Sequence, residues 1–192
     1  MRKIVVFNLV SLDGFFAGPK GEIDWHNTDR EFAKFAEEQT QEFKTLIFGH
    51  VTYTLMKSYW PTRQAIGDDP IVAKVINTAP KIVFSKKLTK AQETSVWKNV
   101  TLYKEINSKE IKKLKAQPGG DMTILGSGTI VEQFTNLGLV DEYRLLLNPV
   151  VLGKGKPMFK HPLKLKLLKT RIFQSGNVLL YYQPAVKLKS GA

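Results

Sequence analysis

Apolar residues recur along the chain in two alternating spacings. Short runs of apolar, often β-branched residues predict buried strands, and stretches with apolar residues three or four positions apart predict helices. The predicted strands are residues 3–10, 45–48, 81–84, 100–103, 122–125 and 142–147. The predicted helices are about residues 28–43, 51–60, 70–77, 108–116 and 129–137. Because this alternation needs crossover connections, it predicts an α/β fold with a mostly parallel sheet.

The end of the chain follows a different pattern. Residues 163–173 and 178–183 read as two strands joined by a turn at Ser175-Gly176-Asn177, which predicts a C-terminal antiparallel hairpin. A length of 192 residues fits a single domain over residues 1–192. The expected architecture is a three-layer sandwich with a mixed, mostly parallel sheet.

Turns that could bind a ligand follow several of the predicted strands. They are Asp13-Gly14, Gly49-His50, Ser85-Lys86 and Gly126-Ser127-Gly128. The carboxyl ends of parallel strands meet at one edge of the sheet, where ligands of such folds bind. The last turn leads into a helix N-terminus, whose backbone N–H groups can face a phosphate, and Ser127 and Thr129 add hydroxyl donors.

Composition narrows the chemistry. The chain has no cysteine, and its three histidines lack metal-ligand spacing, so we expect no disulfide, thiol nucleophile or metal site. The third glycine of the dinucleotide fingerprint would fall at Val131, so a Rossmann domain is not indicated. No apolar run approaches the roughly 18 residues of a membrane span. We therefore expect a soluble, cytoplasmic protein without a membrane partner.

Positive charge is concentrated in the second half of the chain. The net charge is +12; residues 1–96 carry 13 Lys/Arg against 11 Asp/Glu, and residues 97–192 carry 16 against 6. Such a half could bind nucleic acid, anionic lipid or a small anionic ligand, but a solvated face is more frequent. Since aromatics interleaved with these lysines are sparse, nucleic acid is not the expected partner.

Some candidate residues have two readings. Asp13, Asp24 and Asp29 cluster early in the sequence with Trp25 among them. A carboxylate beside an aromatic ring can have a raised pKa and donate a proton; the alternatives are a turn residue for Asp13 and a helix cap for Asp29. Ser85-Lys86 could hold the 2′-phosphate of NADP or could be a solvated turn. Residues 153–157, which include Lys154 and Lys156, resemble a phosphate loop in composition only and predict a mobile connection.

Taken in order, three motifs resemble a known family. They are Ser11-Leu12-Asp13-Gly14 followed by Ala17-Gly18, the Gly49-His50-x-Thr52-Tyr53 turn, and Gly126–Thr129 with Leu139-Val140-Asp141-Glu142 downstream. Together they resemble the dihydrofolate reductase superfamily. The branch they are most similar to is the reductase domain of the bifunctional riboflavin-biosynthesis deaminase-reductase, in a stand-alone form.

The resemblance implies a dihydrofolate reductase-like fold, a homodimer, and an NADPH-dependent reductase of a small heterocyclic substrate. The activity would be similar to that of 5-amino-6-(5-phosphoribosylamino)uracil reductase or dihydrofolate reductase, with Asp13 as the catalytic residue. The implied substrate-binding residues are Asn8, Ser11, Trp25 and Asp29. The implied cofactor-binding residues are Gly49, His50, Thr52, Ser85, Lys86, Gly126, Ser127, Gly128 and Thr129.

Two positions depart from the family pattern. His50 stands where family members often carry Arg, so Lys86 or Lys87 would supply the charge for a phosphate. Leu125 stands where riboflavin reductases tend to carry an acidic residue, so the phosphoribosylaminopyrimidine substrate is not carried over. A nucleotide-binding regulator without turnover and a basic nucleic-acid-binding module remain as alternative functions.

Overall fold

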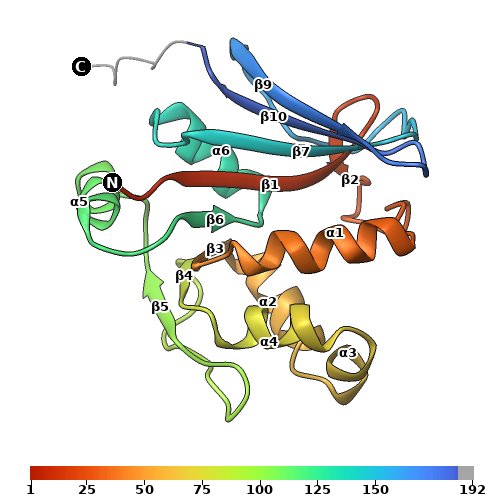
Figure 1. The fold of residues 1–192 in the computed structure, drawn as a ribbon. Helices are drawn as coiled ribbons and strands as arrows, with labels where there is room; N and C mark the ends of the chain where they lie inside the picture. Colours follow the sequence, from red (N-terminus) through yellow and green to blue (C-terminus); the bar gives the residue numbers. More distant parts are fainter. Residues whose placement is uncertain (186–192) are drawn as a thin grey trace.

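The computed structural model describes residues 1–185, which form an eight-stranded sheet and a separate two-stranded sheet (Figure 1). The large sheet has the order β5-β4-β3-β6-β1-β7-β10-β9. Its strands are β1 (Ile4–Ser11), β3 (Thr45–Gly49), β4 (Lys81–Phe84), β5 (Val100–Tyr103), β6 (Met122–Ile124), β7 (Glu142–Asn148), β9 (Leu165–Ile172) and β10 (Val178–Pro184). The helices are α1 (Arg30–Gln41), α2 (His50–Tyr59), α3 (Arg63–Asp68), α4 (Pro70–Thr78), α5 (Ser108–Ala116) and α6 (Gly128–Asn136).

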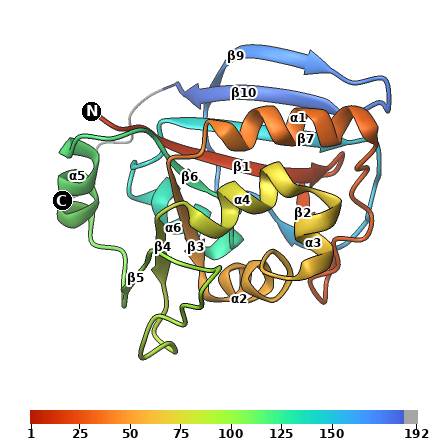
Figure 2. The same ribbon diagram turned by 60° about the horizontal axis from the view of Figure 1, so that its bottom comes forward.

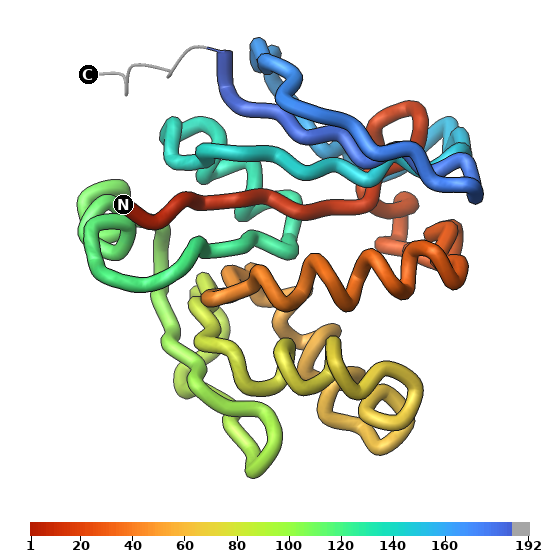
Figure 3. Tube along the Cα trace, viewed as in Figure 1, coloured from red at the N-terminus to blue at the C-terminus, as the bar shows by residue number. Residues whose placement is uncertain are grey.

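Strand β1 lies at the centre of the sheet, although it is the first element of the chain. It pairs in parallel with β6 on one side and with β7 on the other, so that Val5 lies opposite both Thr123 and Glu142. The trace in Figure 3 shows β1, in red, running between these two later segments. Strands β3, β4 and β5 continue the parallel part. The antiparallel part is β10 between β7 and β9, which confirms the predicted C-terminal hairpin.

Helices cover both faces of the sheet (Figure 2). On one face, Tyr53 of α2 and Ile76 of α4 pack with Phe48 and Val83 of the sheet, while Phe35 of α1 packs with a neighbouring cluster. On the other face, the apolar cluster contains Ile111 of α5 and Ile130, Val131 and Phe134 of α6. The predicted three-layer α/β sandwich is confirmed.

Three short elements were not predicted. Helix α3 has six residues and begins after Thr62, whose side chain accepts a hydrogen bond from the Ala65 N–H. Strands β2 (Phe15–Ala17) and β8 (Lys156–Pro157) form the two-stranded antiparallel sheet. Lys156 and Pro157, which were predicted to belong to a connection over residues 153–157, therefore form a strand. A two-residue strand has no periodicity to read, and only its pairing with β2 creates it.

Two further sequence observations concern membrane spans and the basic second half of the chain. Within residues 1–185, no helix is long and apolar enough to cross a membrane. Lys187 and Lys189 of the basic second half lie outside the described residues.

Candidate functional site

The predicted site residues gather where the parallel strands end. Strands β1, β3, β4 and β6 run in the same direction, so Ser11, Gly49, Ser85 and Gly126 come at the same edge of the sheet. From β1 through β3 and β4 to β5 the chain moves toward one side of the sheet, and from β5 through β6 to β7 it returns. Such a reversal separates the connections at the carboxyl edge and leaves a place for a ligand.

Two helices at this edge begin without a side-chain cap. Among the six helices of residues 1–185, α2 begins after Gly49 and α6 after Ser127, and neither has a side-chain hydrogen bond at its N-terminus. The other four helices are capped by side chains. These capping residues are Asp29, Thr62, Asp69 and Asn107. Because uncapped N–H groups and the helix dipole favour an anion, the first turns of α2 and α6 suit the phosphates of a nucleotide.

These two N-termini are in direct contact. The Gly49 N–H donates to the Gly126 carbonyl oxygen over 2.9 Å. A Cβ atom added at Gly49 would lie 2.6 Å from Ser127 Oγ, and one added at Gly126, whose φ is +122°, would lie 2.9 Å from Thr52 Oγ1. Both positions therefore require glycine, because the two turns approach too closely for a side chain. A cis peptide bond joins Gly126 and Ser127.

The turn after β4 lies next to the N-terminus of α2. Ser85 Oγ lies 3.5 Å from His50 Nδ1 and accepts hydrogen bonds from the Lys87 and Leu88 N–H groups. Ser85 is buried, whereas Lys86 and Lys87 are exposed. The structure thus brings the Ser85 turn to the N-terminus of α2, with two lysines facing solvent.

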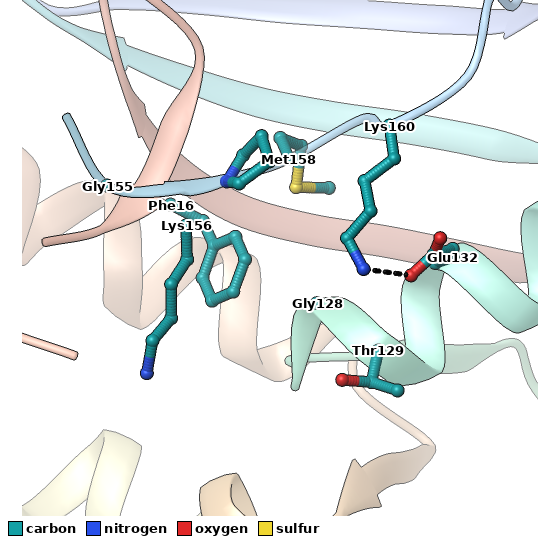
Figure 4. Close-up of a pocket in the computed structure, with 9 residues that line it drawn as sticks. Phe16, Gly128, Thr129, Glu132, Gly155, Lys156, Met158 and Lys160 are labelled. Carbon is teal, nitrogen blue, oxygen red and sulfur yellow. Dashed lines mark hydrogen bonds and ion pairs between the residues drawn. The ribbon is translucent and has the colours of Figure 1, made fainter. Parts of the chain in front are cut away.

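The remaining predicted cofactor residues, Gly128 and Thr129, line a cavity of about 200 Å³ on the α6 side (Figure 4). Gly128 packs closely against the ring of Phe16 from β2, which leaves no room for a Cβ atom. Thr129 is exposed. Other lining residues include Glu132, Lys156 and Lys160. Phe16 and Lys156 were not predicted as site residues, because only the pairing of β2 with β8 brings them here.

The Asp13 carboxylate accepts hydrogen bonds from one hydroxyl and two backbone N–H groups. These donors are the Ser11 hydroxyl at 2.7 Å, the Leu152 N–H at 3.2 Å and the Gly153 N–H at 2.8 Å. The Ser11 hydroxyl and these backbone N–H groups lower the pKa of Asp13. The carboxylate is therefore held in its charged form, which does not suit a proton donor near neutral pH.

The four predicted substrate residues have different surroundings. Ser11 is buried, and its Oγ also accepts a hydrogen bond from the Phe15 N–H. The Asp29 carboxylate caps α1 by accepting from the Phe32 N–H at 2.8 Å, which is the alternative that the sequence left open. Asn8 shares a face of β1 with Val6 and Val10, both in the α6-side cluster, and its buried Oδ1 has no hydrogen-bond partner.

Trp25 lies in the segment between β2 and α1. It is half-buried, donates from Nε1 to the Glu22 carbonyl oxygen and meets the His26 ring edge-on, with centroids 4.5 Å apart. Burial lowers the pKa of His26 to about 4, and its buried Nε2 has no hydrogen-bond partner. The next residue, Asn27, ties this segment to β7 through its N–H, which donates to Asn148 Oδ1.

Comparison with protein families decides the relationship. Residues 2–181 match the model of the RibD C-terminal domain. The chain belongs to the RibD C-terminal domain family. The chain is also similar to YyaP of Bacillus subtilis strain 168, an uncharacterized protein that is 34% identical over 186 residues, or 94% of each chain.

Solved structures share the fold of this RibD C-terminal domain. A putative riboflavin biosynthesis protein from Shewanella sp. PV-4 has a TM-score of 0.71 at 23% identity, over 96% of this chain and 99% of the other. Dihydrofolate reductase from Enterococcus faecalis, solved with NADP(H), has a TM-score of 0.64 at 14% identity, over 96% and 97%. The predicted dihydrofolate reductase-like fold is thereby confirmed.

Proposed function

We propose that this RibD C-terminal domain protein is an NADPH-dependent reductase of a small heterocyclic substrate. The observation that carries the proposal is the pair of uncapped helix N-termini, α2 and α6, in contact at one edge of the sheet. The residues present fit a dinucleotide, because two adjacent turns offer N–H donors to its phosphates. The Enterococcus dihydrofolate reductase of the same fold was solved with NADP(H).

NADPH, when bound, supplies the hydride, and the protein's part is to bind and orient the reactants. Gly49, His50 and Thr52 of one turn and Gly126–Thr129 of the other would hold the cofactor, with Ser85 at their side. Trp25 and the buried Ser11 are the predicted residues we retain for the substrate. We assign Asp13 a positioning role, since its carboxylate is charged and holds Leu152 and Gly153.

The preference for NADPH over NADH is the first prediction. Lysine binds phosphate as a point charge, and Lys86 and Lys87 are exposed beside Ser85. Saturation at about 100 times the Kd stabilises the folded state by about 2.7 kcal/mol, which raises the melting temperature by roughly 5–10 °C. We expect NADPH to produce this shift in differential scanning fluorimetry and NADH to produce less.

Variants locate the preference. Lys86→Ala should weaken NADPH binding and leave NADH binding unchanged. Lys87→Ala tests the neighbouring lysine as the alternative phosphate contact, and Lys90→Ala is the control on the same loop. Equal or absent shifts of the melting temperature with both nucleotides at millimolar concentration would contradict the proposed function. An oxidation assay of NADPH with pterin and pyrimidine substrates then separates a reductase from a nucleotide-binding regulator.

We also propose that the protein is a homodimer, as the family resemblance implies, and that it is cytoplasmic. Light scattering on the purified protein tests the dimer through its mass. A mass of 21.7 kDa, that of one chain, would contradict it.

A further inference from the structure

Three polar side chains are buried in the interior beneath α2 and α4. They are Tyr53 of α2, Asn77 of α4 and Trp97 of the connection between β4 and β5, and they are 1%, 3% and 0% exposed. Among residues 1–185, Tyr53 Oη, Asn77 Oδ1 and Trp97 Nε1 have no hydrogen-bond partner. Because a buried polar atom without a partner destabilises the fold, three such atoms in one region need an explanation.

These three residues are neighbours. The rings of Tyr53 and Trp97 meet edge-on, with centroids 5.8 Å apart, inside the same apolar cluster. Lys81 Nζ lies 4.5 Å from the centroid of the Trp97 ring and donates to the Asn77 carbonyl oxygen over 2.8 Å. The N–H of Lys98, the residue after Trp97, donates to the same carbonyl oxygen. Three segments of the chain therefore bring their unpaired polar groups to one small region.

The orientation of the Asn77 amide is fixed by a neighbour. Its Nδ2 group donates to the Trp60 carbonyl oxygen over 2.9 Å, and exchanging the amide N and O would set two acceptors against each other. Oδ1 is therefore an acceptor only. The nearby Lys81 ammonium does not supply its donor, because its three hydrogens are used by the carbonyl oxygens of Asn77, Ala79 and Lys98.

The unpaired atoms require a ligand that both donates and accepts hydrogen bonds. The Trp97 indole N–H only donates, Asn77 Oδ1 only accepts, and the Tyr53 hydroxyl can do either. An anion would face the amide oxygen, and a cation would face the indole N–H and the Lys81 ammonium. Water fits all three groups, and buried waters typically make about three hydrogen bonds to polar atoms that lack other partners.

We propose that Tyr53 Oη, Asn77 Oδ1 and Trp97 Nε1 bind one internal water molecule. This water joins α2, α4 and the connection between β4 and β5. The first turn of α2 and the Ser85 turn belong to two of these elements, so the water ties together two parts of the candidate cofactor site. The inference itself does not depend on the proposed function, and its tests need no nucleotide.

Water cross-peaks in a nitrogen-edited rotating-frame NMR spectrum of the full chain test the site. Trp60 is the matched control, because its Nε1 donates to Met56 Sδ over 3.0 Å. We expect the Trp97 indole hydrogen to show a cross-peak with a long-lived water and the Trp60 indole hydrogen to show none. The peak should persist in Tyr53→Phe, because the water keeps two partners and this variant has no hydroxyl proton that could relay the signal.

Urea denaturation gives the second measurement. Loss of a satisfied hydrogen bond should raise the unfolding equilibrium constant of Tyr53→Phe about fivefold, whereas removal of an unpaired hydroxyl would leave it unchanged or lower it. Tyr59→Phe, at an exposed position of the same helix, is the control and should not change it. The absence of the Trp97 peak in either protein, or an unchanged or lower constant in Tyr53→Phe, overturns the proposal. The wild-type spectrum keeps the test decisive if the variant does not fold.

Discussion

The carboxylate of Asp13 ties the end of β1 to the loop before β8. It accepts hydrogen bonds from the N–H groups of Leu152 and Gly153, which stand three and two residues before Gly155 of the cavity. We expect Asp13→Ala to speed the exchange of these two amide hydrogens, because they lose their acceptor. Asp13→Asn keeps one carbonyl acceptor and should give an intermediate rate. Unchanged exchange at both amides in Asp13→Ala would contradict the positioning role.

His26 predicts how stability depends on pH. Its pKa is about 4 in the folded protein because of burial, against 6.5 in a model peptide. Between these values the unfolded chain binds more protons, so the free energy of unfolding should fall as the pH drops from 6.5 to 4. Allowing for solvent screening, we expect a loss of about 2 kcal/mol. Urea denaturation at several pH values measures it.

The matched variants for this pH dependence are His26→Phe and His161→Gln. The phenylalanine keeps a flat ring and removes the titrating group, so the fall in stability should shrink. His161 is exposed, with 67% of its side chain accessible, and its replacement should leave the fall in place. The reverse result would show that another group dominates this pH range.

The side chain of Lys81 donates hydrogen bonds at the C-terminal end of α4. Its buried Nζ donates to the carbonyl oxygens of Asn77 at 2.8 Å, Ala79 at 2.8 Å and Lys98 at 3.1 Å, and lies over the Trp97 ring. A cation at a helix C-terminus satisfies carbonyl groups that lack helical partners. We expect Lys81→Met to lower the free energy of unfolding at pH 7 by about 2–3 kcal/mol, because buried acceptors lose their donor.

The pH dependence of this effect has a defined sign. Burial lowers the pKa of Lys81 to about 8 from 10.5. Between these values the unfolded lysine keeps its proton and the folded one loses it. As the pH rises from 8 to 10.5, the free energy of unfolding of the wild type should therefore rise relative to that of Lys81→Met. Allowing for screening, the gain is about 2 kcal/mol. Parallel stability curves for the two proteins from pH 8 to 10.5 would contradict it.

Elements with a strong pattern were predictable, and those made by tertiary pairing were not. The β-branched run of β1 and the Asp69-Pro70 start of α4 define their elements locally. In contrast, β8 exists only through β2. The same contrast holds for the site. The glycine turns are recognisable in the sequence, whereas Lys156 reaches the cavity through a strand pairing that no local pattern encodes.

For the whole molecule, the two uncapped helices lie on opposite faces of one sheet and meet at its carboxyl edge. A bound dinucleotide should therefore slow amide exchange in the first turns of α2 and α6 together. Exchange at the opposite edge should not change, for example around the Lys115–Asp141 ion pair. Hydrogen exchange with and without NADPH tests this footprint. Protection of only one helix, or of the far edge, would contradict a ligand shared between the two turns.

The central place of β1 has a consequence for biosynthesis. Its partner residues include Met122 for Ile4 and Glu142 for Val5, so both neighbours of the first strand are translated long after it. At about 5–20 residues per second, the nascent strand waits on the order of ten seconds for β6 to leave the ribosome. During that time an apolar segment, Ile4–Val10, has neither of its neighbouring strands. A chaperone that binds extended apolar segments would therefore find a target in Ile4–Val10 during this interval.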